Sequence, residues 1–282
     1  MVGVLKDAPE NPGGHPETRA TARARDRWSV SVSRFFWVGA AGLVLAVGVA
    51  LLARHAIDYP IMTFLSRSQG RSTLVEKLLL APGRFDLLGG PIFIAGIWLV
   101  WFDAPRQETR ARVIAGLLGS AAAGGVSRLL QLSLHSHPRP LHDSALSFTP
   151  PPWIDADALN HWNSFPSDHA ALFFGLALTV FLERPRLGIA AFAWAVLVDL
   201  DRVYSGIHFP SDVVGGAALG LLFVCASQRR PIRLACGQIV RWAGRAPGPF
   251  YGCAFLLCYE VAELFGGIRD FGHAIGHLLH PS

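Results

Sequence analysis

Charged residues are scarce in this chain. Only 16% of its 282 residues are Asp, Glu, Lys or Arg, whereas soluble domains carry about a quarter. Hydrophobic residues make up 51% of the chain, and the mean hydropathy is +0.37. This balance argues against a soluble globular protein and favours an integral membrane protein.

Cysteine is also rare. The four cysteines match no zinc-ligand spacing and suggest no disulfide framework; they are Cys225, Cys236, Cys253 and Cys258. Three histidines, His135, His137 and His142, surround Arg139, but two prolines interrupt them and the guanidinium would repel a metal ion. We therefore expect no metal and no cofactor.

Uncharged apolar runs dominate the sequence. With their flanking residues, six of them approach the roughly 20-residue helix that spans a bilayer. They are 35–53, 87–102, 113–134, 170–182, 187–198 and 213–226. The sequence thus predicts an all-α, integral membrane bundle of six transmembrane helices. A seventh segment, 249–267, carries Glu260 and Glu263 and is expected to be interfacial or weakly spanning, since carboxylates are costly inside a span.

The flanking segments complete the predicted organisation. Residues 1–34 are rich in Pro, Gly, Ala and Arg and are expected to form a disordered cytoplasmic tail. The transmembrane domain covers 35–227, with an amphipathic segment on the outer surface at about 60–85. The C-terminal extension 228–282 is expected to be cytoplasmic or interfacial. Most Lys and Arg residues fall on the side of the N-terminus, which therefore faces the cytoplasm. This topology explains the basic charge without nucleic acid.

The tetrapeptide FPSD occurs twice. Residues 165–168 are followed at once by His169, and residues 209–212 are preceded at once by His208. In the six-helix topology both copies lie at the outer face, where each begins a membrane helix. The helices that follow match poorly, so a duplicated module is not indicated. We interpret the copies as two halves of one site.

The second copy offers a histidine with a carboxylate partner. His208 and Asp212 are four residues apart, which places them on one face of a helix turn. A carboxylate bound to one imidazole nitrogen makes the other more basic, as a histidine nucleophile requires. Arg202 supplies a forked cation suited to phosphate. The alternative is a capping aspartate with an interfacial histidine and arginine.

The first copy offers an anion cradle and an acid. Pro166 suits the first position of a helix, which leaves the N–H groups of Ser167 and Asp168 and the Ser167 hydroxyl free to bind an anion. His169 follows within the first turn and could protonate a leaving oxygen. A plain N-terminal turn capped by Asp168 is the alternative. Arg139, held between two prolines, is a further phosphate ligand or a contact for lipid headgroups.

Small residues recur every four positions in the flanking spans. Gly116, Ser120 and Gly124 form one such stripe, and extending it outward reaches Arg128. A second stripe through Gly216 and Gly220 leads to Asp212 in the same way. Such stripes let membrane helices pack closely, so the polar groups that continue them should point into the bundle.

Taken together, these stretches resemble the type-2 phosphatidic acid phosphatase family. The resemblance rests on Arg139-Pro140, on Pro166-Ser167-Asp168-His169, and on Arg202 with His208 and Asp212 at the family spacing. It implies metal-independent hydrolysis of a phosphate ester or anhydride. By position, His208 would form a phosphohistidine, Asp212 would orient it, and His169 would act as acid and then base. Arg139, Arg202 and Ser167 would hold the phosphoryl oxygens.

Three positions depart from the family pattern. Leu132 stands where the family has a lysine, and Arg128 is our candidate substitute, with His135 or His137 as others. Asp168 replaces a glycine, and Asp201 replaces a serine. A carboxylate beside a bound phosphate is unfavourable unless it is paired or protonated.

The variant Pro-Ser-Asp-His is similar to the bacterial undecaprenyl pyrophosphate phosphatase branch of the family. The resemblance therefore implies hydrolysis of undecaprenyl pyrophosphate in the cell membrane, with the site at the outer face. The alternatives are a phosphatidic acid or phosphatidylglycerol phosphate phosphatase, or a lipid phosphotransferase. A lipid-binding or transport protein without catalysis stays open as a third hypothesis.

Overall fold

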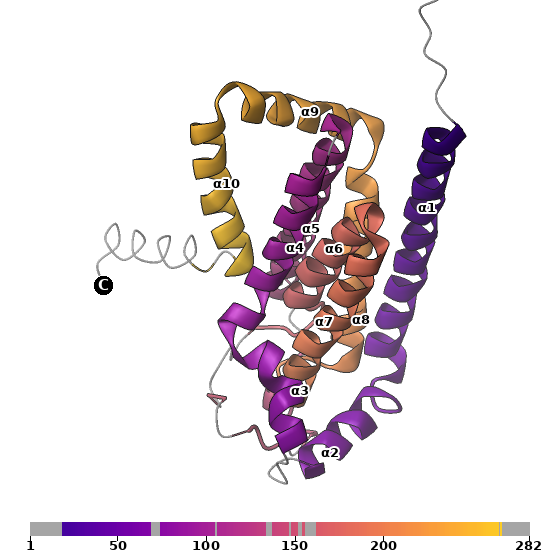
Figure 1. Ribbon diagram of the computed structural model, residues 1–282. Helices are drawn as coiled ribbons and strands as arrows, with labels where there is room; N and C mark the ends of the chain where they lie inside the picture. The colour runs from indigo at the N-terminus through magenta and orange to yellow at the C-terminus, as the bar shows by residue number, and fades with distance from the viewer. Residues whose placement is uncertain are drawn as a thin grey trace, which may run out of the picture.

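The computed structural model describes residues 19–68, 74–104, 106–133, 137–146, 148–151, 154–155, 162–264 and 266. Within these ranges all regular structure is helical, which confirms the predicted all-α class (Figure 1). The main helices are α1 (Arg19–Gly48), α2 (Asp58–Ser68), α3 (Leu74–Arg84), α4 (Gly90–Asp103), α5 (Gln107–Ser133), α6 (Asp168–Glu183), α7 (Pro185–Tyr204), α8 (Pro210–Ser227), α9 (Arg230–Arg245) and α10 (Pro247–Ala262).

Each of the six predicted apolar runs lies largely within one helix, namely α1 and α4 to α8. Among the described residues, three segments are long and apolar enough to cross a membrane: Asp26–Ala53, Gln107–Ser133 and Pro210–Ser227. Helix α4 is apolar but shorter. The protein is thus a membrane protein, while six crossings stay a prediction. Helix α7 departs from a purely apolar span because its last turns hold Asp199, Asp201 and Arg202.

Helix α1 begins earlier than the sequence suggested. It starts at Arg19, inside the segment 1–34 for which we expected disorder, so helix replaces disorder from that residue onward. Alanine and arginine are strong helix formers, and they dominate the stretch from Arg19 to Arg27. Residues 1–18 lie outside the described part of the chain.

Small residues bring α5, α6 and α8 into close contact, as the stripes predicted. A Cβ atom added at Gly216 would lie 2.1 Å from the backbone oxygen of Ser167, and one at Gly220 would lie 2.3 Å from that of Ala171. A Cβ atom at Gly116 of α5 would lie 2.4 Å from the side-chain oxygen of Thr179 on α6. These glycines set the spacing between the helices that carry the polar residues.

The C-terminal helices form an L beside the bundle (Figure 1). Helix α9 crosses the end opposite to α2 and α3, with Cys236 and Val240 buried. Helix α10 then returns alongside α4, where the ring of Phe250 stacks on Trp101 at 5.5 Å. This helix overlaps the seventh segment, 249–267, whose relation to the membrane stays a prediction.

The contact at Gly216 gives a test of the packing. We expect Gly216→Ala to lower the thermal midpoint by several degrees, because a methyl group there meets backbone and overpacking costs about 1–3 kcal/mol. Gly42→Ala is the matched control, since its Cβ would make an ordinary 3.5 Å contact with Ala218. The measurement is thermal unfolding of both variants in one detergent. Equal midpoints would contradict the packing described here.

Candidate active site

The two FPSD copies lie side by side at the starts of α6 and α8. The N–H of Ser167 donates to the carbonyl oxygen of Asp212 at 3.0 Å, which joins the two helix starts directly. Their registers differ. Ser167 is the N-cap of α6, so Pro166 precedes the helix instead of opening it as predicted, whereas Pro210 is the first residue of α8. The same tetrapeptide thus places Asp168 and Asp212 at different helix positions.

His208 lies between α7 and α8 and is 1% exposed. Its Nδ1–H donates to the carbonyl oxygen of Ser164 at 2.9 Å. Its Nε2 lies 3.4 Å from a guanidinium nitrogen of Arg139, a group that can only donate, so Nε2 presents a lone pair. Burial lowers the pKa of His208, which favours this neutral form. The ring is therefore held as an imidazole whose free nitrogen borders the cavity described below.

Asp212 lies beside His208 and also has partners that the sequence did not predict. Its Oδ1 accepts from Nε2–H of His137 at 3.1 Å, and its Oδ2 accepts from the N–H of Phe209 at 2.7 Å. The distance from Oδ2 to Nδ1 of His208 is 3.6 Å. The Ser164 carbonyl, and not this carboxylate, makes the close hydrogen bond to His208. Asp212 fixes the turn that carries His208 and contributes its charge from slightly farther away.

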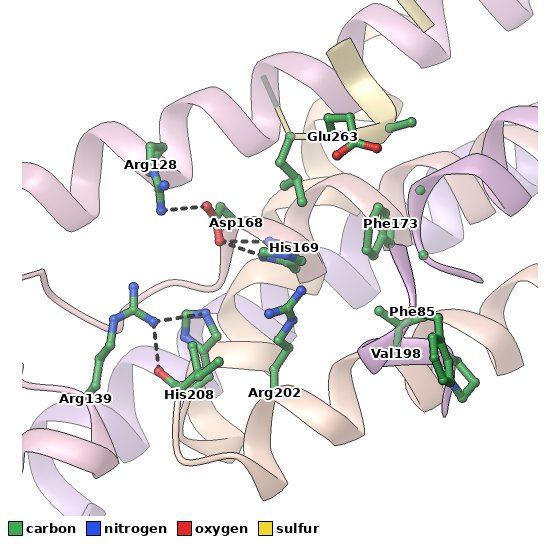
Figure 2. A pocket seen from close by; sticks show the side chains of 17 residues that line it. Phe85, Arg128, Arg139, Asp168, His169, Phe173, Val198, Arg202, His208 and Glu263 are labelled. Atoms are coloured by element: carbon green, nitrogen blue, oxygen red, sulfur yellow. Dashed lines mark hydrogen bonds and ion pairs between the residues drawn. The ribbon is translucent and has the colours of Figure 1, made fainter. Parts of the chain in front are cut away.

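Asp168 is paired, which removes the difficulty of a carboxylate near a phosphate. Its Oδ1 accepts from Nδ1–H of His169 at 3.2 Å, and its Oδ2 forms a 3.0 Å ion pair with Arg128 (Figure 2). Arg128 also lies 4.1 Å from the ring centre of Trp162. Both carboxylate oxygens are thus occupied, so the Asp168 side chain is placed to position His169 and Arg128.

Two further arginines border the same space. Arg139 is 1% exposed and donates to the Ile207 carbonyl oxygen at 2.8 Å and to Oε1 of Gln131 at 3.3 Å. Burial lowers its pKa to about 10, so it stays charged at neutral pH. The buried Nε of Arg202 has no hydrogen-bond partner among the described residues. Arg202 therefore keeps a donor for an incoming anion.

These groups line one cavity of about 270 Å³. One wall gathers the side chains of Arg128, Arg139, Asp168, His169, Arg202 and His208 (Figure 2). Residues of 82–90 and the end of α10, including Glu263, close the other side. Three guanidinium groups beside two imidazoles favour a phosphate or another oxyanion.

Ser167 does not line this cavity. It is fully buried, its hydroxyl oxygen accepts from the N–H of Ala170 at 3.3 Å, and its own N–H is taken by Asp212. The contact with α8 thus takes one of the predicted anion donors, the N–H of Ser167, while the hydroxyl oxygen of Ser167 caps the helix. Leu132, at the family lysine position, is 51% exposed and does not border the cavity.

Three contributors were missed from the sequence. Ser164 acts through its carbonyl, which carries no residue-specific signal. His137 was considered only as a metal ligand or as a substitute for the lysine, and its contact with Asp212 assigns it to support. Gln131 lies one turn beyond Arg128 on the same helix face, a spacing that could have shown it; its amide donates to the Pro166 carbonyl oxygen at 2.6 Å. His135 lies outside the described residues.

Comparison with known proteins confirms the resemblance. Residues 134–231 match the PAP2 superfamily model. Three relatives align at 32% identity: the bacitracin transport permease protein BcrC of Bacillus licheniformis, over 46% of this chain and 61% of the relative; the putative undecaprenyl-diphosphatase YbjG of Escherichia coli, over 49% and 64%; and a lipid A 1-phosphatase of Rhizobium etli, over 44% and 48%.

The matched segment is thus similar to the PAP2 superfamily, and it contains Arg139, His169, Arg202, His208 and Asp212. The chain spans about half to two thirds of the length of these relatives. Helices α9 and α10 lie almost wholly beyond the matched residues.

The support given by His137 can be tested by substitution. We expect His137→Ala to destabilise the protein by about 1–3 kcal/mol, because it removes a donor from the buried Asp212 carboxylate. His55→Ala is the control, since His55 is exposed and its ring packs edge-on against Tyr59. Thermal unfolding compares the two. A His137→Ala protein as stable as the control variant would show that Asp212 does not depend on this bond.

Proposed function

We propose that the protein is a membrane lipid phosphatase that hydrolyses a phosphate ester or anhydride through a phosphohistidine, with undecaprenyl pyrophosphate as the favoured substrate. The observation that carries this proposal is the pair of imidazoles bordering one cavity with three arginines. One imidazole presents a lone pair, and the other is bound to a carboxylate. This is the division of roles that a nucleophile and an acid require.

In the first step, the guanidinium groups of Arg139, Arg202 and Arg128 bind the phosphoryl oxygens. Arg139 then donates to the phosphate instead of to Nε2 of His208, so the lone pair of Nε2 becomes available. Nε2 attacks phosphorus, and the bond from phosphorus to the leaving oxygen breaks. The Ser164 carbonyl holds the Nδ1 proton throughout, so the ring keeps its orientation as positive charge develops. Positioning and charge of this kind supply most of what phosphoryl transfer needs.

His169 acts first as the general acid and then as the general base. Its Nδ1 is held by Asp168, so its Nε2 is the nitrogen left to serve the cavity. As an imidazolium it gives a proton to the leaving oxygen; as an imidazole it then takes one from water. That water attacks phosphorus, the bond to His208 breaks, and inorganic phosphate leaves. Asp168 stabilises the imidazolium form, and Arg128 balances the carboxylate when His169 is neutral.

The names of the relatives support a lipid substrate and leave more than one open. They include an undecaprenyl-diphosphatase and a lipid A 1-phosphatase. Phosphatidic acid or phosphatidylglycerol phosphate remains the second candidate, as does transfer of the phosphoryl group to an acceptor other than water. The two imidazoles in the cavity favour catalysis over lipid binding alone, and we take Arg128 as the substitute for the cation lost at Leu132.

We further propose that the N-terminus is cytoplasmic and that the cavity faces the outer side of the cell membrane. The basic loops support this topology, because they gather at the opposite end of the helices. An outward-facing site would return the lipid carrier to use after it has delivered a cell-wall precursor.

The function is tested by phosphate release from purified protein in EDTA. We expect undecaprenyl pyrophosphate to be hydrolysed faster than phosphatidic acid or phosphatidylglycerol phosphate, and His208→Asn to reduce the rate at least about 10³-fold, since it removes the nucleophile. Arg229→Gln, on the turn between α8 and α9, is the control and should keep the wild-type rate.

Full activity of His208→Asn would remove the proposed nucleophile. Phosphate release that depends on divalent metal would contradict the mechanism. No release from any lipid phosphate in the panel would refute the enzyme and favour a binding protein.

A further inference from the structure

A second cavity, of about 240 Å³, lies between α4, α5, α9 and α10. Aromatic rings form much of its wall, contributed by Trp98, Trp101, Trp242 and Phe250, and aliphatic side chains and two cysteines complete it. None of the described residues that line it is charged. A cavity of this kind can bury a hydrocarbon chain but provides no charged group to bind a polar ligand.

The same two helices border both cavities. Gly90 at the start of α4 and Ala262, Glu263 and Leu264 at the end of α10 line the phosphate cavity. Residues farther along each helix line the apolar one, Ile97 to Trp101 on α4 and Phe250 to Cys258 on α10. With a rise of 1.5 Å per residue, the apolar wall of α10 begins about 6 Å from Ala262 and ends about 18 Å from it.

The helices almost touch where the two cavities approach each other. A Cβ atom at Gly90 would lie 2.2 Å from the backbone oxygen of Ala262, and Phe93 and Val261 are buried there. The inside of this contact between α4 and α10, here called the seam, is therefore filled. Leu257 lines the apolar cavity and is 38% exposed, so the outer edge of the seam is open to a chain that arrives along α10.

We propose that the apolar cavity binds the distal part of the hydrocarbon tail of the lipid whose phosphate occupies the active site. This inference rests on the proposed function, because it takes the head of the lipid to lie among the arginines. The seam then selects for one long chain: a tail must extend about 14 Å from the level of Ala262 to reach Cys253. A polyprenyl chain does so, and a geranyl chain is too short.

The position of α9 fits this assignment. Its Trp242 packs edge-on against Phe250 at 5.5 Å and closes the far end of the cavity. Because α9 and α10 lie almost wholly outside the matched family residues, the tail site belongs to a part of the chain that the family domain does not provide.

Cys253 allows a test that does not depend on catalysis. It lines the apolar cavity and is exposed, whereas Cys225, Cys236 and Cys258 are buried. We expect undecaprenyl phosphate to slow maleimide labelling of Cys253 about tenfold in detergent, and geranyl phosphate at the same concentration to leave it unchanged. Equal labelling rates with the two lipids would overturn the tail site, whatever the enzyme does.

A kinetic test uses a variant in which a larger side chain fills the apolar cavity. We expect Ala254→Trp to raise the KM for undecaprenyl pyrophosphate about tenfold and to leave geranyl pyrophosphate hydrolysis unchanged, because the new ring occupies the space of the distal tail. Phe255→Trp is the matched control on the exposed face of the same helix, where Phe255 is 67% exposed.

The kinetic outcomes separate the two proposals. A KM for undecaprenyl pyrophosphate that Ala254→Trp does not change, or a loss shared equally by both substrates, would overturn the tail site. Hydrolysis of neither substrate by the wild-type protein would refute the proposed function instead, and the labelling experiment would still decide the tail site.

Discussion

The contact between the starts of α6 and α8 is the constraint on which the site depends. The N–H of Ser167 donates to the carbonyl oxygen of Asp212, and Gly216 lets the backbone at Ser167 approach where a larger residue could not stand. This contact carries His169 and His208, 39 positions apart in the sequence, to one cavity. Without it, the two copies of FPSD would be two unrelated helix starts.

Charge balance follows from that contact. Three arginines meet in a buried space, and such a cluster needs compensation when no anion is bound. Asp168 provides it by pairing with Arg128, and the same carboxylate orients His169. Where the family has a lysine and a glycine, this chain has Leu132 and Asp168. We propose that the arginine and the carboxylate act together: Arg128 supplies the cation in place of the lysine, and Asp168 links it to His169.

The sequence predicted the elements well and the hydrogen bonds less well. Apolar runs located the helices, because burial in lipid or in a bundle requires continuous hydrophobic surface. The stripes through Gly116 and Gly216 located the close contacts and brought in Arg128. Residue type and spacing could not show that Ser164 holds His208, since a backbone carbonyl is common to every residue. They also could not show that Ser167 donates its N–H to Asp212 and uses its hydroxyl oxygen to cap α6.

Two further differences have physical reasons of the same kind. The early start of α1 reflects the high helix propensity of alanine and arginine. The prediction of disorder rested on composition and did not take this propensity into account. The role of Asp212 depends on His137, which comes from a loop 75 positions away and could be placed only by the tertiary fold.

The central claim is that Nε2 of His208 accepts the phosphoryl group from the substrate. A trapping experiment tests this claim most directly. Purified protein is mixed with undecaprenyl pyrophosphate carrying a radioactive terminal phosphate, quenched in alkali within milliseconds, and digested for peptide mapping. We predict base-stable, acid-labile label on the peptide that contains His208. Label confined to another residue, or no label during rapid turnover, would contradict a phosphohistidine at His208.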